Sequence, residues 1–110
     1  MSNVLKKRIG NHMMNLDVED GGISAVLYHQ GQRELAFMGL LQNEVEEGMT
    51  CVDLGSNIGY TTLYMLENCG DDGFVYAIEP DPRNLKLLKE NIEENGYENH
   101  ETVHCAISDN

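Results

Sequence analysis

Positive charge is scarce in this chain of 110 residues. Seven Lys and Arg residues stand against nineteen Asp and Glu residues, so the formal net charge is −12. Contacts to nucleic-acid phosphates need clustered Lys and Arg, and an anionic membrane surface attracts the same side chains. The sequence therefore predicts no nucleic-acid partner and no membrane partner.

Cysteines and long apolar runs are also few. Cys51, Cys69 and Cys105 are odd in number and show no CxxC spacing and no paired histidine, which favours free thiols and no metal site. No run of residues is long and apolar enough to cross a bilayer, and the charged N-terminus lacks the apolar segment of a signal peptide. We therefore expect a cytoplasmic protein, because a reducing compartment keeps thiols free.

The second half of the chain alternates between strand and helix patterns. Strands are predicted at 50–53, 74–79 and 102–107, with helices over 59–69 and from residue 82 onward. The second helix has a clear start signal, because Asp81 suits the N-cap and Pro82 suits the first helical position. Short connections between such elements favour a parallel sheet with right-handed crossovers.

The first half of the chain has a weaker and more mixed pattern. A hairpin is predicted over 4–9 and 12–18, a further strand over 24–29, and a helix over 33–47 that ends at Gly48. These patterns predict two domains, an N-terminal β-rich extension over 1–32 and a Rossmann-like domain over 33–110.

The most informative segment joins the first strand of the second half to its helix. Asp53 ends the apolar run, and two glycines, Gly55 and Gly59, precede the helix. Nucleotide-like ligands bind at such turns in open α/β sheets. A dinucleotide fits poorly here, because its fingerprint has glycine where this strand ends in Asp53. At about 4 Å, a carboxylate would repel the pyrophosphate by roughly 4 kcal/mol.

S-adenosylmethionine, which has no phosphate, fits this turn better. Asp53 suits its ammonium group, Gly55 and Gly59 allow the backbone to come close, and the amides and hydroxyls at 59–61 suit its carboxylate. Glu79 ends the next strand, 20 residues after Gly59, which is the placement of an acid that binds ribose hydroxyls. The alternative is a structural glycine turn with incidental acids.

These segments resemble the FkbM-type class I S-adenosylmethionine-dependent methyltransferases. The resemblance rests on 52–63, 75–82, 87–92 and 106–109, and it covers about residues 13–110. It implies cofactor contacts from Asp53, Gly55, Asn57, Gly59, Thr61, Glu79, Pro80, Ala106 and Ile107. In this scheme the turn residues bind the methionine end, Glu79 binds the ribose, and Pro80 with Ala106 and Ile107 borders the adenine.

The resemblance also implies a fold and an activity. The fold is a three-layer α/β, Rossmann-like methyltransferase fold, truncated here after the third parallel strand. The activity is methyl transfer to oxygen on a small molecule or sugar, with no catalytic base assigned. The isolated chain is then expected to be inactive, and the alternative is a non-catalytic cofactor-binding or self-association module. An open edge at 50–53 predicts a homo-oligomer formed through that edge, or else cover of the exposed surface by the N-terminal strands.

Overall fold

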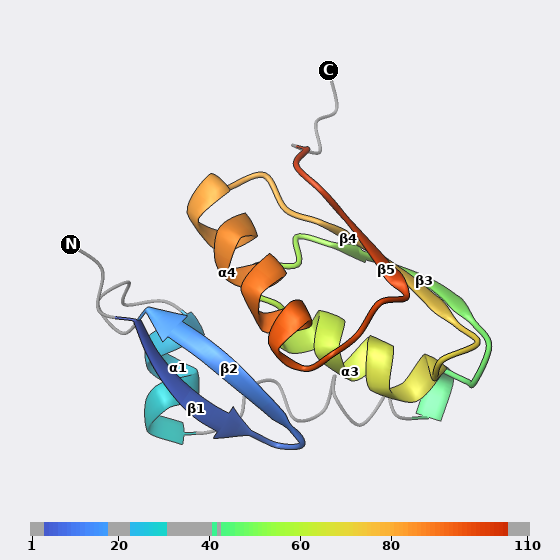
Figure 1. Ribbon diagram of the computed structural model, residues 1–110, viewed down its shortest axis with the longest axis horizontal. Coiled ribbons are helices and arrows are strands. Elements are labelled where there is room, and N and C mark those ends of the chain that lie inside the picture. The colour runs from blue at the N-terminus through green and yellow to red at the C-terminus, as the bar shows by residue number, and fades with distance from the viewer. Residues whose placement is uncertain (1–3, 18–22, 31–40, 42, 106–110) are drawn as a thin grey trace.

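The computed structural model describes residues 4–17, 23–30, 41 and 43–105 of the chain. In chain order, the elements are β1 (Val4–Ile9), β2 (His12–Asp17), α1 (Ile23–Gln30), β3 (Thr50–Leu54), α3 (Tyr60–Cys69), β4 (Phe74–Ile78), α4 (Pro82–Glu94) and β5 (His100–Val103). Figure 1 shows the β1–β2 hairpin and α1 beside α4, with the β3–β5 sheet on the far side of α3 and α4. No described helix has the length and apolar character needed to cross a membrane.

The second half of the described chain forms a parallel sheet with the strand order β3-β4-β5. Successive right-handed crossovers in one direction place α3 and α4 on the same face of that sheet. Val75 and Ala77 of β4 are fully buried on the helix-covered face, whereas Val52 and Leu54 of β3 are 54% and 60% exposed. The predicted parallel β-α-β-α-β arrangement is confirmed, and β3 and β5 are the edge strands of the described sheet.

The N-terminal hairpin shares one hydrophobic core with this sheet and its helices. β1 and β2 pair in antiparallel fashion around Gly10, whose positive φ of 61° suits the tight turn, so the predicted hairpin is confirmed. Met14 and Leu16 of β2 are buried and belong to the same core as Leu63 of α3 and Leu88 of α4. Burial of these side chains therefore joins the hairpin to the helices that cover the sheet.

The prediction of a strand over 24–29 is wrong, because Ile23–Gln30 forms the helix α1. Where burial in this segment is described, Ser24 and Leu27 are buried, three residues apart as on one face of a helix, and Tyr28 is 37% exposed. The Ser24 hydroxyl also accepts a hydrogen bond of 3.1 Å from the Asp17 amide. Packing against β2 at a helical spacing has overridden the strand propensity of this apolar run.

Two further predictions differ in their bounds. Most of the helix predicted over 33–47 lies outside the described residues, although residues 41, 43 and 44 are helical. β5 begins two residues before the predicted strand and ends at Val103, because its register is set by β4, with His100 opposite Val75. The apolar end of the predicted strand, from 106 onward, lies outside the described residues.

Helix α4 begins as its sequence signal predicts. The Asp81 carboxylate accepts hydrogen bonds from the amides of Arg83 and Asn84, at 2.8 and 3.4 Å, and Pro82 is the first helical residue. These bonds lower the pKa of Asp81 below its ordinary value, the Arg83 amide being the main cause. The ionised carboxylate is therefore the form that stabilises the helix start.

Replacement of this cap gives a pH-dependent prediction. Asp81→Ala should lower the urea midpoint of unfolding at pH 7 without a change in m-value, and Asp81→Asn should retain most of the stability, because Asn also caps helices well. The stabilisation from Asp81 is present above its unfolded-state pKa of about 3.9 and is lost as pH falls toward the lower folded-state value. Urea melts of the three proteins at pH 7 and pH 3 test this. A midpoint for Asp81→Ala equal to that of the wild type at pH 7 would contradict it.

Candidate functional site

The turn after β3 is built from backbone in the left-handed region. Gly55, Asn57 and Gly59 have φ angles of 73°, 55° and 105°, and Asn57 is the non-glycine residue among the described ones with positive φ. Asparagine tolerates this conformation better than most residues. The amides of Gly55 and Ser56 both donate to the Ile78 carbonyl at 2.9 Å. The turn is therefore fixed to the end of the neighbouring strand β4.

Glu79 holds the turn from the other side. This side chain is only 5% exposed. One carboxylate oxygen accepts a 2.6 Å hydrogen bond from the Asn57 amide, and the other accepts a 3.0 Å bond from the Asp81 amide. The carboxylate thus joins the turn after β3 to the loop before α4. Because a carboxylate has about four acceptor positions, two remain for a ligand.

Asp53 is a buried acid at the end of β3. It is 7% exposed, and one of its carboxylate oxygens accepts a 2.6 Å hydrogen bond from the Thr62 hydroxyl in the first turn of α3. Burial raises the pKa of Asp53 above its ordinary value, the Thr62 hydrogen bond partly opposes this rise, and the nearby charge of Glu79 adds to it. A cation placed beside Asp53 would offset the unfavourable burial of the negative charge.

Asn57 offers a second sign that the turn suits a ligand. Its backbone amide donates a hydrogen bond to the Glu79 carboxylate. Its side-chain oxygen Oδ1, in contrast, is buried and has no hydrogen-bond partner among the described residues. A buried acceptor without a donor is unfavourable by about 1–3 kcal/mol. A ligand that brings an N–H or O–H donor to this oxygen would recover that free energy. The ammonium and hydroxyl groups of S-adenosylmethionine are donors of this kind, so the residues present fit that cofactor.

The structure brings together most of the residues that the sequence predicted for the site. Asp53, Gly55, Asn57, Gly59 and Glu79 all lie around the turn. The Ser56 hydroxyl donates to the Asp53 carbonyl at 2.9 Å, and the Gly59 amide donates to the Ser56 carbonyl at 3.0 Å. The remaining predicted residues are placed as follows: Thr61 is half-buried in the first turn of α3, Pro80 is exposed, and Ala106 and Ile107 lie outside the described residues. The Pro80 carbonyl lies 2.8 Å from a ring nitrogen of His104.

Sequence reasoning missed two polar residues that support the site. Thr62 was passed over in favour of its neighbour Thr61, although a buried strand-end acid needs a donor and the first turn of the next helix supplies one. No role is predicted for Asn91 from the sequence, yet Asn91 is fully buried and donates a 2.7 Å hydrogen bond to the Ile58 carbonyl in the turn. A polar residue at an inward-facing position of α4 was the available signal.

A hollow of about 570 Å³ lies beside the start of β4 and is lined by residues such as Asp71, Phe74 and Tyr97. It is at the amino end of the parallel strands, whereas ligands of open α/β sheets bind at the carboxyl ends. The turn that holds Asp53 and Glu79 is therefore the better candidate.

Comparison with known proteins finds methyltransferases that are similar to part of the chain. No family model matches, so the FkbM-type subfamily is not supported. The chain is similar to the protein-L-isoaspartate O-methyltransferase of Methanococcoides burtonii, with 39% identity over 61 residues, which are 56% of this chain and 30% of that protein. It is also similar to the corresponding protein of Methanothrix thermoacetophila, with 32% identity over 56 residues, 51% of this chain and 27% of that protein. The chain thus matches less than a third of the length of these relatives.

Solved structures agree at the level of the fold. The M. jannaschii TYW2 structure in complex with AdoMet has a TM-score of 0.73 and 23% identity, over 94% of this chain and 43% of that one. The complex of aTrm5 with tRNALeu has a TM-score of 0.67 and 18% identity, over 94% of this chain and 28% of that one.

These relatives correct the predicted partners. The expected small-molecule or sugar acceptor and the expected absence of nucleic acid are wrong as inferences, because the similar proteins include a protein-L-isoaspartate O-methyltransferase and aTrm5 in complex with tRNALeu. The net charge of −12 was a poor basis for excluding nucleic acid, because it is the charge of this chain alone, and the chain matches less than half of the neighbouring chains. The similarities support the coarser expectation, and the chain has the Rossmann-like fold of the class I S-adenosylmethionine-dependent methyltransferases.

Proposed function

We propose that the turn at 53–59, together with Glu79, binds S-adenosylmethionine as the cofactor site of a methyltransferase. The single observation that carries this proposal is a pair of buried acids, Asp53 and Glu79, at the carboxyl ends of adjacent parallel strands around a left-handed turn. The similarity to methyltransferases of known sequence and structure supports it. When bound, the cofactor supplies a methyl group on a sulfonium, which moves to an acceptor nucleophile as S-adenosylhomocysteine leaves.

The residues around the turn have different roles in this proposal. Asp53 pairs with the cofactor ammonium, since a cation offsets its buried charge, and the Asn57 side-chain oxygen accepts a second donor. Glu79 keeps the turn in place with its two backbone contacts and uses its remaining acceptor positions for the ribose hydroxyls. Thr61 is assigned to the carboxylate. Pro80 is assigned to the adenine, together with Ala106 and Ile107.

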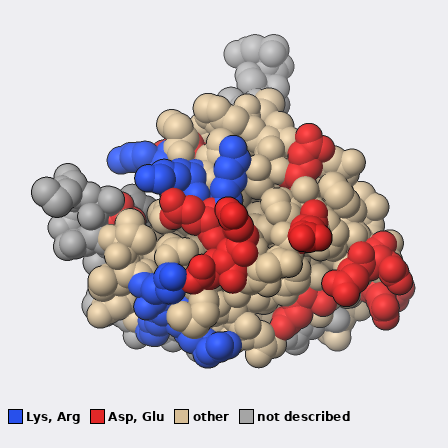
Figure 2. All heavy atoms as spheres, viewed as in Figure 1, with Lys and Arg blue, Asp and Glu red and all other residues tan. Residues whose placement is uncertain are grey.

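The acceptor that we propose is a protein side chain. The name shared by the curated relatives gives the acceptor of those proteins as isoaspartate in a protein. On the face in Figure 2, basic side chains lie on the left and near the centre, and acidic ones spread from the centre to the right. With S-adenosylhomocysteine bound, an isoaspartyl peptide should bind more tightly than its aspartyl twin. Equal affinities for the two peptides would contradict the proposal that isoaspartate is the acceptor.

Calorimetric titration separates S-adenosylmethionine chemistry from dinucleotide chemistry. We expect S-adenosylhomocysteine to bind and NAD to bind far more weakly, because Asp53 repels a pyrophosphate placed over the turn. Both ligands carry adenosine, so a preference between them reports on the turn and not on the adenine. A preference for NAD, or no binding of S-adenosylhomocysteine, would reject the proposed site.

Asp53→Asn should separate function from stability. Asn keeps an oxygen for the Thr62 hydroxyl and removes the buried charge, so the unliganded variant should be more stable than the wild type at pH 7. Because burial raises the folded-state pKa of Asp53, ionisation destabilises the fold at neutral pH. The advantage of Asn should therefore shrink as pH falls through that raised pKa toward about 3.9. Affinity for S-adenosylhomocysteine should fall about tenfold to a hundredfold, as for a lost charged hydrogen bond.

The matched control for this variant is Asp72→Asn, which removes one negative charge from an exposed turn. It should leave both the unfolding free energy and the cofactor affinity close to those of the wild type. Urea unfolding between pH 4 and pH 7 and calorimetry at pH 7 give the two readouts. If Asp53→Asn were less stable and bound the cofactor as well as the wild type, Asp53 would be a structural residue only.

A further inference from the structure

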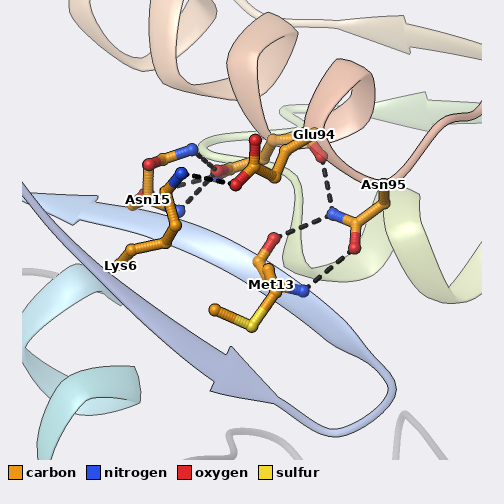
Figure 3. Close-up of polar contacts among 6 residues, drawn as sticks. Lys6, Met13, Asn15, Glu94 and Asn95 are labelled. Carbon is orange, nitrogen blue, oxygen red and sulfur yellow. Dashed lines mark hydrogen bonds and ion pairs between the residues drawn. The ribbon is translucent and has the colours of Figure 1, made fainter.

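The edge of β2 that does not pair with β1 is held by side chains of α4 and of its C-cap residue, Asn95. Alternate residues of a strand point their amide and carbonyl groups away from the partner strand, and such an edge needs other partners when it is buried. The Asn95 side chain accepts from the Met13 amide at 2.9 Å and donates to the Met13 carbonyl at 2.8 Å. Figure 3 shows this pair of bonds, with Asn15 and the Lys6–Glu94 ion pair of 2.6 Å farther along the hairpin.

Asn91, one helical turn before Asn95, repeats this arrangement at Asn15. Its side-chain oxygen accepts from the Asn15 amide at 2.6 Å, and its side-chain nitrogen donates to the Asn15 carbonyl at 3.3 Å. The two asparagines thus imitate a neighbouring strand for Met13 and Asn15. The two side-chain nitrogens differ in their further acceptor: that of Asn91 also donates to the Ile58 carbonyl at 2.7 Å, whereas that of Asn95 also donates to the Asn91 carbonyl at 2.7 Å.

Ile58 belongs to the turn that we assign to the cofactor. It lies between Asn57, which is bonded to Glu79, and Gly59, the N-cap of α3. Gly59 is packed closely, since a Cβ there would lie 3.1 Å from a methyl carbon of Leu88 on the same helix as Asn91. The fully buried side chain of Asn91 therefore contacts both the hairpin and the Ile58 carbonyl, which lies between the left-handed residues Asn57 and Gly59.

We propose that Asn91 is a positioning residue for the cofactor turn, and this inference rests on the proposed function of that turn. By holding the Ile58 carbonyl, Asn91 keeps the Asn57 amide directed at Glu79 and the Gly59 peptide at the start of α3. Its bonds to Asn15 make the N-terminal hairpin part of the support of the site. The hairpin thereby affects cofactor binding without a contact to the cofactor.

Asn91→Ala and Asn95→Ala form a matched pair that tests this role. Both variants remove bonds between α4 and β2, but only the first removes a bond to the turn. At a temperature where circular dichroism shows both variants folded, Asn91→Ala should bind S-adenosylhomocysteine about tenfold more weakly than the wild type, and Asn95→Ala within about twofold. A merely structural role would shift the melting temperatures and leave both affinities alike. Equal affinities in the two variants would overturn the proposal.

Hydrogen exchange supplies readouts that do not depend on those affinities. In the unliganded proteins, the amides of Asn57 and Gly59 should exchange faster in Asn91→Ala than in Asn95→Ala, and equal rates would overturn the proposal even if no cofactor binds. If Asn91→Ala does not fold, the wild type decides: S-adenosylhomocysteine should slow exchange at the Asn15 amide as well as at Gly59, because coupling between sites is reciprocal. Protection at Gly59 with none at Asn15 would reject the coupling, whereas no binding at all by the wild type rejects the proposed function instead.

Discussion

The hydrogen bonds of the Glu79 carboxylate are the constraint on which the site depends. One oxygen holds the Asn57 amide after β3, and the other holds the Asp81 amide before α4. These two loops lie at the same end of the sheet because β3 and β4 are parallel and adjacent. A single buried acid therefore sets the relative position of the turn that follows one strand and of the helix that follows the next. An acid in this place both stabilises the loops and faces the region where a cofactor would lie.

Buried polar groups in and around the turn show a second common feature. Asp53, Thr62, Glu79 and Asn91 are all less than a tenth exposed, and each has a hydrogen bond that fixes backbone or a neighbouring side chain. Such networks are stable when every member is satisfied. Two groups in this region are not fully satisfied. Burial raises the pKa of Asp53, and the side-chain oxygen of the neighbouring Asn57 has no hydrogen-bond partner among the described residues. A ligand that carries a cation and hydrogen-bond donors would stabilise both groups.

Local signals in the sequence were sufficient for the parts of the fold that depend on local chemistry. The cap at Asp81, the glycines of the turn and the apolar run of β4 predicted α4, the turn and the sheet correctly. Tertiary packing decided the rest. Helix α1 was missed because its apolar run has strand propensity, although the run packs against β2 as a helix, and β5 differs from its predicted bounds because β4 sets its register. The support from Thr62 and Asn91 was missed because it depends on which side chains of two helices meet the turn.

An amide-resolved nuclear magnetic resonance titration with S-adenosylhomocysteine tests the central claim most directly. The amides of Asn57 and Asp81 report on the Glu79 carboxylate, since both donate to it. If the turn and Glu79 form a cofactor site, these two resonances should shift in a saturable manner together with those of Gly59 and Thr61. If the ligand instead shifted only resonances beside the hollow at the amino end of β4, with Asn57 and Asp81 unchanged, the assignment of the cofactor to the turn and Glu79 would be contradicted.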